Sequence, residues 1–107
     1  MVIFLCEGST DGILTGVYDA WASRLGHDRV ALRIDAQMDL ELFAEYRKVD
    51  TNAQKAQKVA RSVQKKMGME AWQTIYQASL CAASERADCI YRVIVLGMSP
   101  HVDQHTA

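Results

Sequence analysis

The first residues of the chain restrict its fold more than any other segment. Val2–Cys6 is continuously apolar, a pattern typical of a β-strand that is covered on both faces. Ser9 or Thr10 is suited to cap a helix in which apolar residues recur at three- and four-residue steps as far as Leu25, and Gly26 is suited to end it. We therefore expect a central strand followed by a helix that packs on the sheet.

Two further segments predict the rest of the sheet. Arg29–Asp35 alternates apolar and polar residues, as a half-buried strand does. We expect it to pair parallel to Val2–Cys6 through a right-handed crossover. Leu42–Lys48 predicts a third strand, which we expect to pair antiparallel at this sheet. The prediction is an α+β fold: a small three-stranded mixed sheet with one βαβ crossover, packed with about four helices.

The second half of the chain is predicted to be helical. Thr51–Gln54 has the sequence of a capping box, which opens a helix that Gly68 should end. Met69–Ala82 predicts the next helix, and Ser84 is suited to cap a last one that extends to Met98. Four aromatic residues and two cysteines lie on the apolar stripes of the predicted helices, the first helix included, and we expect them in the core: Tyr18, Trp21, Trp72, Tyr76, Cys81 and Cys89.

Length and composition indicate one domain. Residues 1–98 are enough for a single α+β domain with its own core, whereas Ser99–Ala107 is polar and contains the only Pro, so we expect a frayed tail or a truncation point there. Ile90–Met98 is apolar but short and interrupted by Arg92, so no membrane span is predicted. The three cysteines lack a CxxC pair, which fits reduced thiols and a cytoplasmic protein.

Positive charge is concentrated in one part of the chain. Arg47–Lys66 contains seven of the twelve Lys and Arg residues and one acid, Asp50, so its net charge is +6 while the whole chain carries −1. Such an asymmetry indicates a polyanionic partner, with nucleic acid as the first candidate.

The cations of this segment share one face of the predicted helix. At about 100° per residue, the apolar residues fill an arc of about 120° and the cations a separate arc of about 140°. No acid shares the basic face, although a solvated surface that serves solubility alone usually mixes Glu with Lys. The candidate nucleic-acid-binding residues are Lys55, Lys58, Arg61, Lys65 and Lys66, with Arg47 and Lys48 at the margin.

Catalytic and metal-binding patterns are absent from the sequence. It contains no Ser-His-Asp order, G-x-S-x-G, H-E-x-x-H or zinc-deaminase signature, so whether the protein is an enzyme stays open. Asp35, Asp39 and Glu41 are interpreted as solvated acids rather than Mg²⁺ ligands. Cys6–Gly12 is interpreted as a structural turn, because it lacks the Lys of a phosphate-binding loop and the three-glycine fingerprint, and its own acids would repel a phosphate. We predict no metal and no cofactor.

Three segments resemble one bacterial family. Val2–Glu7 together with Asp11–Trp21, Lys55–Arg61 and Ile90–Gly97 are similar to the N-terminal portion of a family of DNA metabolism or DNA repair proteins. The resemblance extends from Val2 to about Met98. Members of that family tend to be encoded beside a radical-SAM protein that bears a DNA-binding helix-hairpin-helix, and some are fused to a uracil-DNA-glycosylase-like domain. The family supplies no established catalytic residue, so the resemblance implies DNA repair without implying an active site.

These observations lead to one hypothesis and two alternatives. The first is an N-terminal domain of a DNA-repair-associated protein that docks on nucleic acid without reading its sequence, because phosphate contacts position a protein and do not distinguish bases. The second is an adaptor whose basic helix meets an acidic surface of the radical-SAM partner. The third is the non-catalytic half of an enzyme whose active site lies beyond residue 107. The oligomeric state is left open.

Overall fold

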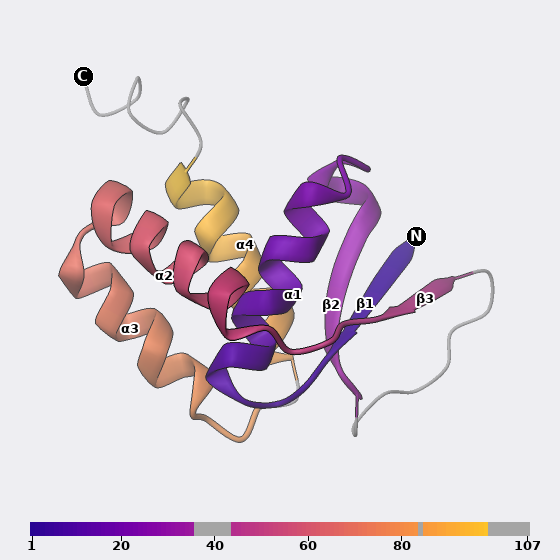
Figure 1. Ribbon diagram of the computed structural model, residues 1–107, viewed down its shortest axis with the longest axis horizontal. Coiled ribbons are helices and arrows are strands. Elements are labelled where there is room, and N and C mark those ends of the chain that lie inside the picture. The colour runs from indigo at the N-terminus through magenta and orange to yellow at the C-terminus, as the bar shows by residue number, and fades with distance from the viewer. Residues whose placement is uncertain (36–43, 84, 99–107) are drawn as a thin grey trace.

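The computed structural model describes residues 1–35, 44–83 and 85–98, and shows an α+β fold (Figure 1). Four α-helices and a three-stranded sheet are present in these ranges, as predicted. In chain order the elements are β1 (Val2–Cys6), α1 (Thr10–Ala22), a short 3-10 helix (His27–Arg29), β2 (Val30–Ile34), β3 (Glu45–Lys48), α2 (Ala53–Met67), α3 (Met69–Ser79) and α4 (Arg86–Met98).

The sheet has the strand order β2-β1-β3, so the apolar strand β1 is central, as predicted. β2 pairs parallel to β1, with Val30 beside Val2, which confirms the parallel crossover through α1. The antiparallel pairing expected for Leu42–Lys48 is wrong, because β3 is also parallel to β1, with Glu45 beside Val2. A hairpin with β2 would have made β3 antiparallel to it, whereas β3 does not pair with β2 and lies at the opposite edge of β1. The sheet is therefore fully parallel rather than mixed.

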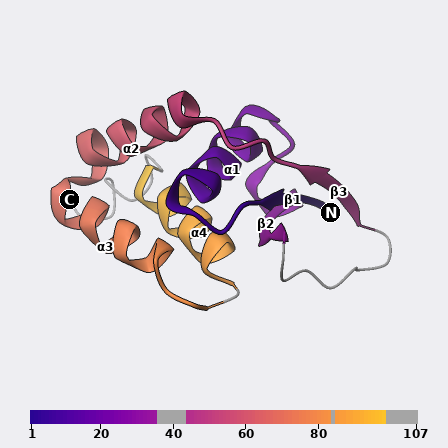
Figure 2. The ribbon, with the colours of Figure 1, turned by 60° about the horizontal axis from the view of Figure 1, so that its bottom comes forward.

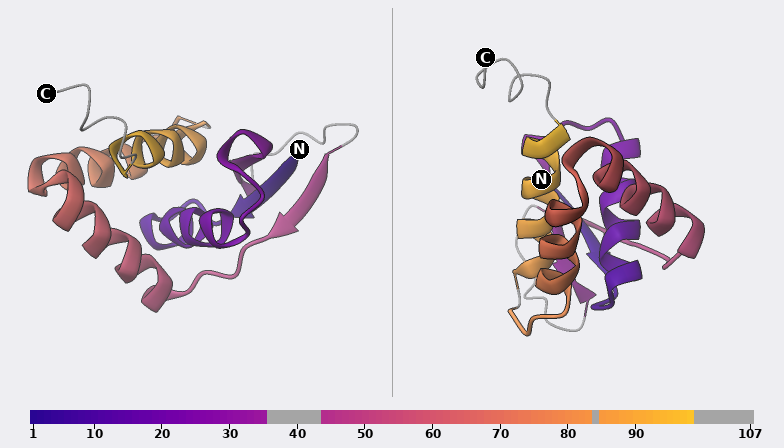
Figure 3. Two further views of the ribbon diagram at one scale, coloured as in Figure 1. Left: turned by 90° about the horizontal axis from the view of Figure 1, so that it is seen from above. Right: turned by 90° about the vertical axis from the view of Figure 1, so that its left-hand side faces the viewer.

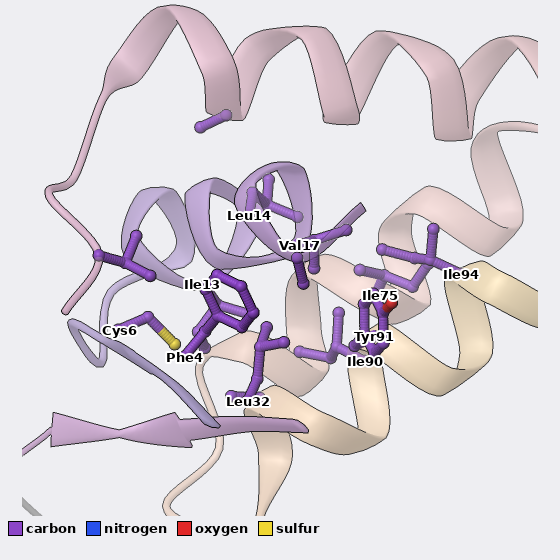
Figure 4. Close-up of a cluster of buried hydrophobic side chains, with 14 of the residues drawn as sticks. Phe4, Cys6, Ile13, Leu14, Val17, Leu32, Ile75, Ile90, Tyr91 and Ile94 are labelled. Atoms are coloured by element: carbon purple, nitrogen blue, oxygen red, sulfur yellow. The ribbon is translucent and has the colours of Figure 1, made fainter. Parts of the chain in front are cut away.

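The main core lies between the sheet, α1 and α4 (Figure 4). Phe4 and Cys6 of β1 and Leu32 of β2 contribute to the same buried cluster as Ile13 of α1 and Tyr91 of α4. α1 approaches the sheet closely. A Cβ at Gly16 would lie 3.1 Å from Leu32 Cδ2 and 3.3 Å from Cys6 Cβ. The glycine thus permits a tighter contact than any larger residue could make.

The other helices pack around α1. α2 packs on α1, α3 on α2, and α4 contacts β2, α2 and α3. In Figures 2 and 3, α1 runs in the angle between α2 and α4. The sheet lies toward one end of the molecule, and α2 and α3 extend toward the opposite end. This arrangement leaves one side of α2 exposed next to α1.

Several residues that were expected in the core are exposed. Cys81 and Cys89 are free thiols, but both are exposed. Cys81 follows the end of α3, and Cys89 lies away from the side of α4 that buries Ile90 and Ile94. Tyr76 is 45% exposed and Trp21 is 40% exposed. Helical periodicity identified a stripe of large residues correctly but could not determine which of them a neighbouring helix would cover.

Some predictions concern residues outside the described ranges. The expected cap Ser84, residues 42 and 43 of the expected third strand, and the segment Ser99–Ala107 lie there. Among the described residues, no helix is both long and apolar enough to span a bilayer.

Candidate nucleic-acid interface

The basic helix α2 forms as the sequence predicts. Its cap differs from the capping box predicted over Thr51–Gln54, which would begin at Thr51: the side chain of Asn52 accepts a hydrogen bond from the Lys55 backbone N–H at 3.0 Å. The helix ends at Gly68, whose positive φ of 95° is a conformation that glycine readily adopts. Its apolar face packs inward, with Ala56 and Val63 buried, although Ala53 at the start of the predicted apolar arc is exposed. The opposite face is thereby presented to solvent.

Four cations of this face are exposed: Lys58, Arg61, Lys65 and Lys66. Within the part of the chain that the structure describes, no carboxylate forms an ion pair with any of them. They lie within nine consecutive residues of one helix, so their charges repel one another and a counter-anion would relieve that repulsion. We call these four residues the α2 cation row.

Lys55 differs from the α2 cation row. Its Nζ lies 3.0 Å from Asp19 Oδ1 of α1 and 5.4 Å from the centre of the Tyr18 ring. The hydrogen bond to Asp19, supported by the attraction between the two charges, raises the pKa of Lys55. Lys55 therefore stays charged, but its charge is balanced by Asp19. It joins α2 to α1 and is less available to a ligand than the α2 cation row.

The two marginal cations lie on the sheet. Arg47 Nε lies 2.6 Å from Glu45 Oε2, and Lys48 Nζ lies 4.0 Å from Asp35 Oδ2. Both side chains belong to β3, and in Figure 3 α2 runs away from this strand toward the other end of the molecule. The fold thus does not bring Arg47 and Lys48 into the α2 cation row, and each already has an acidic partner.

A groove of about 650 Å³ lies beside the α2 cation row. One wall belongs to α1 and the other to α2, while two residues of α4 complete the lining. No lining residue is acidic. The lining residues are Val17, Tyr18, Trp21, Ala22, Lys58, Val59, Arg61, Ser62, Lys66, Ile94 and Met98.

The aromatic side chains of this groove, Tyr18 and Trp21, were expected in the core. Trp21 remains 40% exposed, and Tyr18 is half-buried. The periodicity of α1 puts both residues near its apolar stripe, and only the position of α2 decides that they line a groove instead. The sequence offers no separate signal for this arrangement.

The weaker candidate sites behave as structural features. Arg86 of α4 donates to the carbonyl oxygens of Gly8 at 2.9 Å and of Ser79 at 3.2 Å. Ser9 caps α1 by accepting from the Gly12 N–H at 3.0 Å. This turn is thus held by protein contacts. Asp39 and Glu41 lie outside the described residues.

No protein-family model matches the chain, and neither the curated proteins nor the solved structures include a match.

Proposed function

We propose that this chain is a DNA-repair-associated domain that docks on nucleic acid without sequence specificity. In this role the α2 cation row contacts the phosphates, and the domain helps to bring a partner enzyme to DNA. The resemblance described above suggests a radical-SAM protein as that partner. Because bacterial DNA lies in the cytoplasm, the proposal also implies a cytoplasmic location.

One observation carries the proposal: four exposed cations follow one another along α2 without an acidic partner among the described residues. Contacts from lysine and arginine side chains to phosphates position a protein on nucleic acid without reading its bases. The groove beside the row carries no acid that would repel a phosphate. Lys55 is left out of the predicted contacts because Asp19 occupies it.

A salt titration tests the proposal. If the four side chains each contact one phosphate, the logarithm of the binding constant should fall with the logarithm of salt concentration at a slope of about −2.8 to −3.6, taking about 0.7 to 0.9 per contact. Between about 50 and 200 mM salt this weakens binding about 50- to 150-fold. Fluorescence anisotropy with a labelled oligonucleotide measures it.

Charge reversal provides the decisive variant. Lys58→Glu combined with Arg61→Glu should abolish binding at low salt while the melting temperature stays close to that of the wild type, because both side chains are exposed. Arg24→Glu with Arg29→Glu is the matched control, since it changes the net charge equally at exposed cations outside α2. Wild-type affinity in the α2 variant, or equal losses in both variants, contradicts the proposal.

A further inference from the structure

The groove is lined by both apolar and cationic side chains. Its floor is apolar and includes Val17 of α1, Val59 of α2 and Ile94 of α4. The α2 wall carries three cations of the α2 cation row: Lys58, Arg61 and Lys66. A ligand that fits this lining has a flat apolar part beside negative charges. A volume of about 650 Å³ is typical of pockets that bind a small molecule.

Trp21 is the aromatic group best placed to meet such a ligand. Its indole is 40% exposed, and it contacts the edge of the His27 ring, with 4.6 Å between the ring centres and an angle of 62° between the planes. Much of its surface is therefore accessible although the ring is held by a neighbour. An exposed tryptophan in a groove is a large planar surface that is costly to leave in water.

Tyr18 has a different role in the same wall. Its ring centre lies 6.0 Å from Lys58 Nζ and 5.4 Å from Lys55 Nζ. Both ammonium groups lie close enough to the centre of this ring for cation and ring to attract each other. Tyr18 holds Lys58 beside the groove, and Trp21 remains as the surface on which another ring could stack.

We infer that this groove binds an unpaired base of single-stranded DNA, which stacks on Trp21 while Lys58, Arg61 and Lys66 contact the adjacent phosphates. The inference rests on the proposed function and deepens it by naming the strand type. Stacking on aromatic side chains beside a basic surface is the way in which proteins bind single strands without sequence preference. A duplex keeps its bases stacked inside, so it can reach the cations but cannot present a ring face to Trp21.

The first experiment compares single- and double-stranded oligonucleotides of one sequence at low salt. The wild type should bind the single strand more tightly. Trp21→Ala should weaken single-strand binding about 5- to 150-fold, the range for loss of one stacked base, and should leave duplex binding within about twofold of the wild type. Trp21→Phe should restore most of the single-strand affinity. Tyr76→Ala is the matched control, because it removes an aromatic residue of α3 that is 45% exposed and outside the groove.

The results distinguish this inference from the proposed function. If Trp21→Ala binds both strand types like the wild type while the Lys58→Glu and Arg61→Glu variant binds neither, the stacking site is refuted and the phosphate-binding surface stands. If the charge-reversal variant retains binding, the proposed function itself is refuted. An equal loss of both strand types in Trp21→Ala also refutes the stacking site.

A second measurement leaves Trp21 in place and so does not depend on the folding of the alanine variant. In a Trp72→Phe background, Trp21 is the only tryptophan of the chain. Addition of unlabelled oligothymidylate should quench its fluorescence with the same midpoint as the anisotropy change, because a stacked base quenches the indole. Binding without quenching refutes the inference, as does equal quenching by free thymidine monophosphate, which would indicate a mononucleotide pocket.

Discussion

Lys55 Nζ of α2 lies 3.0 Å from Asp19 Oδ1 of α1, and this ion pair links the two helices that form the walls of the groove. The Asp19 side chain is 25% exposed and that of Lys55 40% exposed, so water screens the pair only in part. Lys55 is one of the five cations that the helical wheel places on the basic face, and Asp19 already balances its charge.

Asp19→Asn should release Lys55 for ligand binding. We expect the salt dependence of nucleic-acid binding to steepen by about 0.7 to 0.9 on the log–log slope, which corresponds to one added phosphate contact. Asp28→Asn removes the same charge from an exposed position outside α1 and α2 and should leave the slope unchanged. An unchanged slope in Asp19→Asn would show that Lys55 contributes equally with and without its partner.

Arg47 and Lys48 should contribute little to binding. Glu45 and Asp35 already pair with them, and β3 lies apart from the groove. The double variant with Arg47→Gln and Lys48→Gln should therefore bind nucleic acid within about twofold of the wild type. A loss comparable to that of a double glutamine variant at Lys58 and Arg61 would extend the binding surface to the sheet.

The three thiols should react at two very different rates. Cys81 and Cys89 are exposed, whereas Cys6 is fully buried in the core, and its thiol donates to the Arg33 carbonyl oxygen at 3.4 Å. A thiol reagent at pH 8 should modify two residues rapidly and the third only after denaturation, because the thiolate is the reactive form. Mass spectrometry of partly labelled protein would identify them. Rapid labelling of Cys6 would contradict its position in β1.

Stability should fall at alkaline pH because of Cys6. Burial raises the pKa of its thiol from 9.0 to about 12, so between these pH values the folded state retains a proton that the unfolded state loses. The free energy of unfolding contributed by this group is complete below pH 9.0 and decreases by about 1.4 kcal/mol per pH unit above it. Urea unfolding at several pH values should show a shallower decrease for Cys6→Ala. Burial also raises the pKa of Tyr91, so a smaller decrease should remain.

The contact between α4 and the edge strand β2 should be important for stability. Asp88 Oδ1 accepts a hydrogen bond from the Leu32 backbone N–H at 3.0 Å, and Arg92 donates to the carbonyl oxygens of Val30 and His27. Asp88→Ala leaves that N–H without its partner and should cost about 1 to 3 kcal/mol. Asp88→Asn, which keeps an acceptor oxygen, should cost less. Equal losses for the two variants, measured by denaturant unfolding, would exclude the hydrogen bond as the cause.

Much of the fold follows from local patterns. The apolar run of β1 identified it as the central strand, because only a strand covered on both faces tolerates five apolar residues in a row. The limits of α2 were predicted from Thr51–Gln54 and Gly68, since capping depends on neighbouring residues alone, although the residue that caps the helix is Asn52. The direction of β3 was not predictable in this way. Its partner strand and its direction are decided by pairing between segments distant in the chain.

The candidate site, like the fold, was predictable from the sequence only in part. The sequence by itself determined that Lys58, Arg61, Lys65 and Lys66 share the exposed face of α2, because helix periodicity separates them from Ala56 and Val63 whatever else the chain does. Only the tertiary structure decided that Asp19 forms an ion pair with Lys55 and that Trp21 lines a groove instead of filling the core. Both outcomes depend on how α2 packs across α1. That packing arises from contacts between residues more than thirty positions apart, which no local pattern encodes.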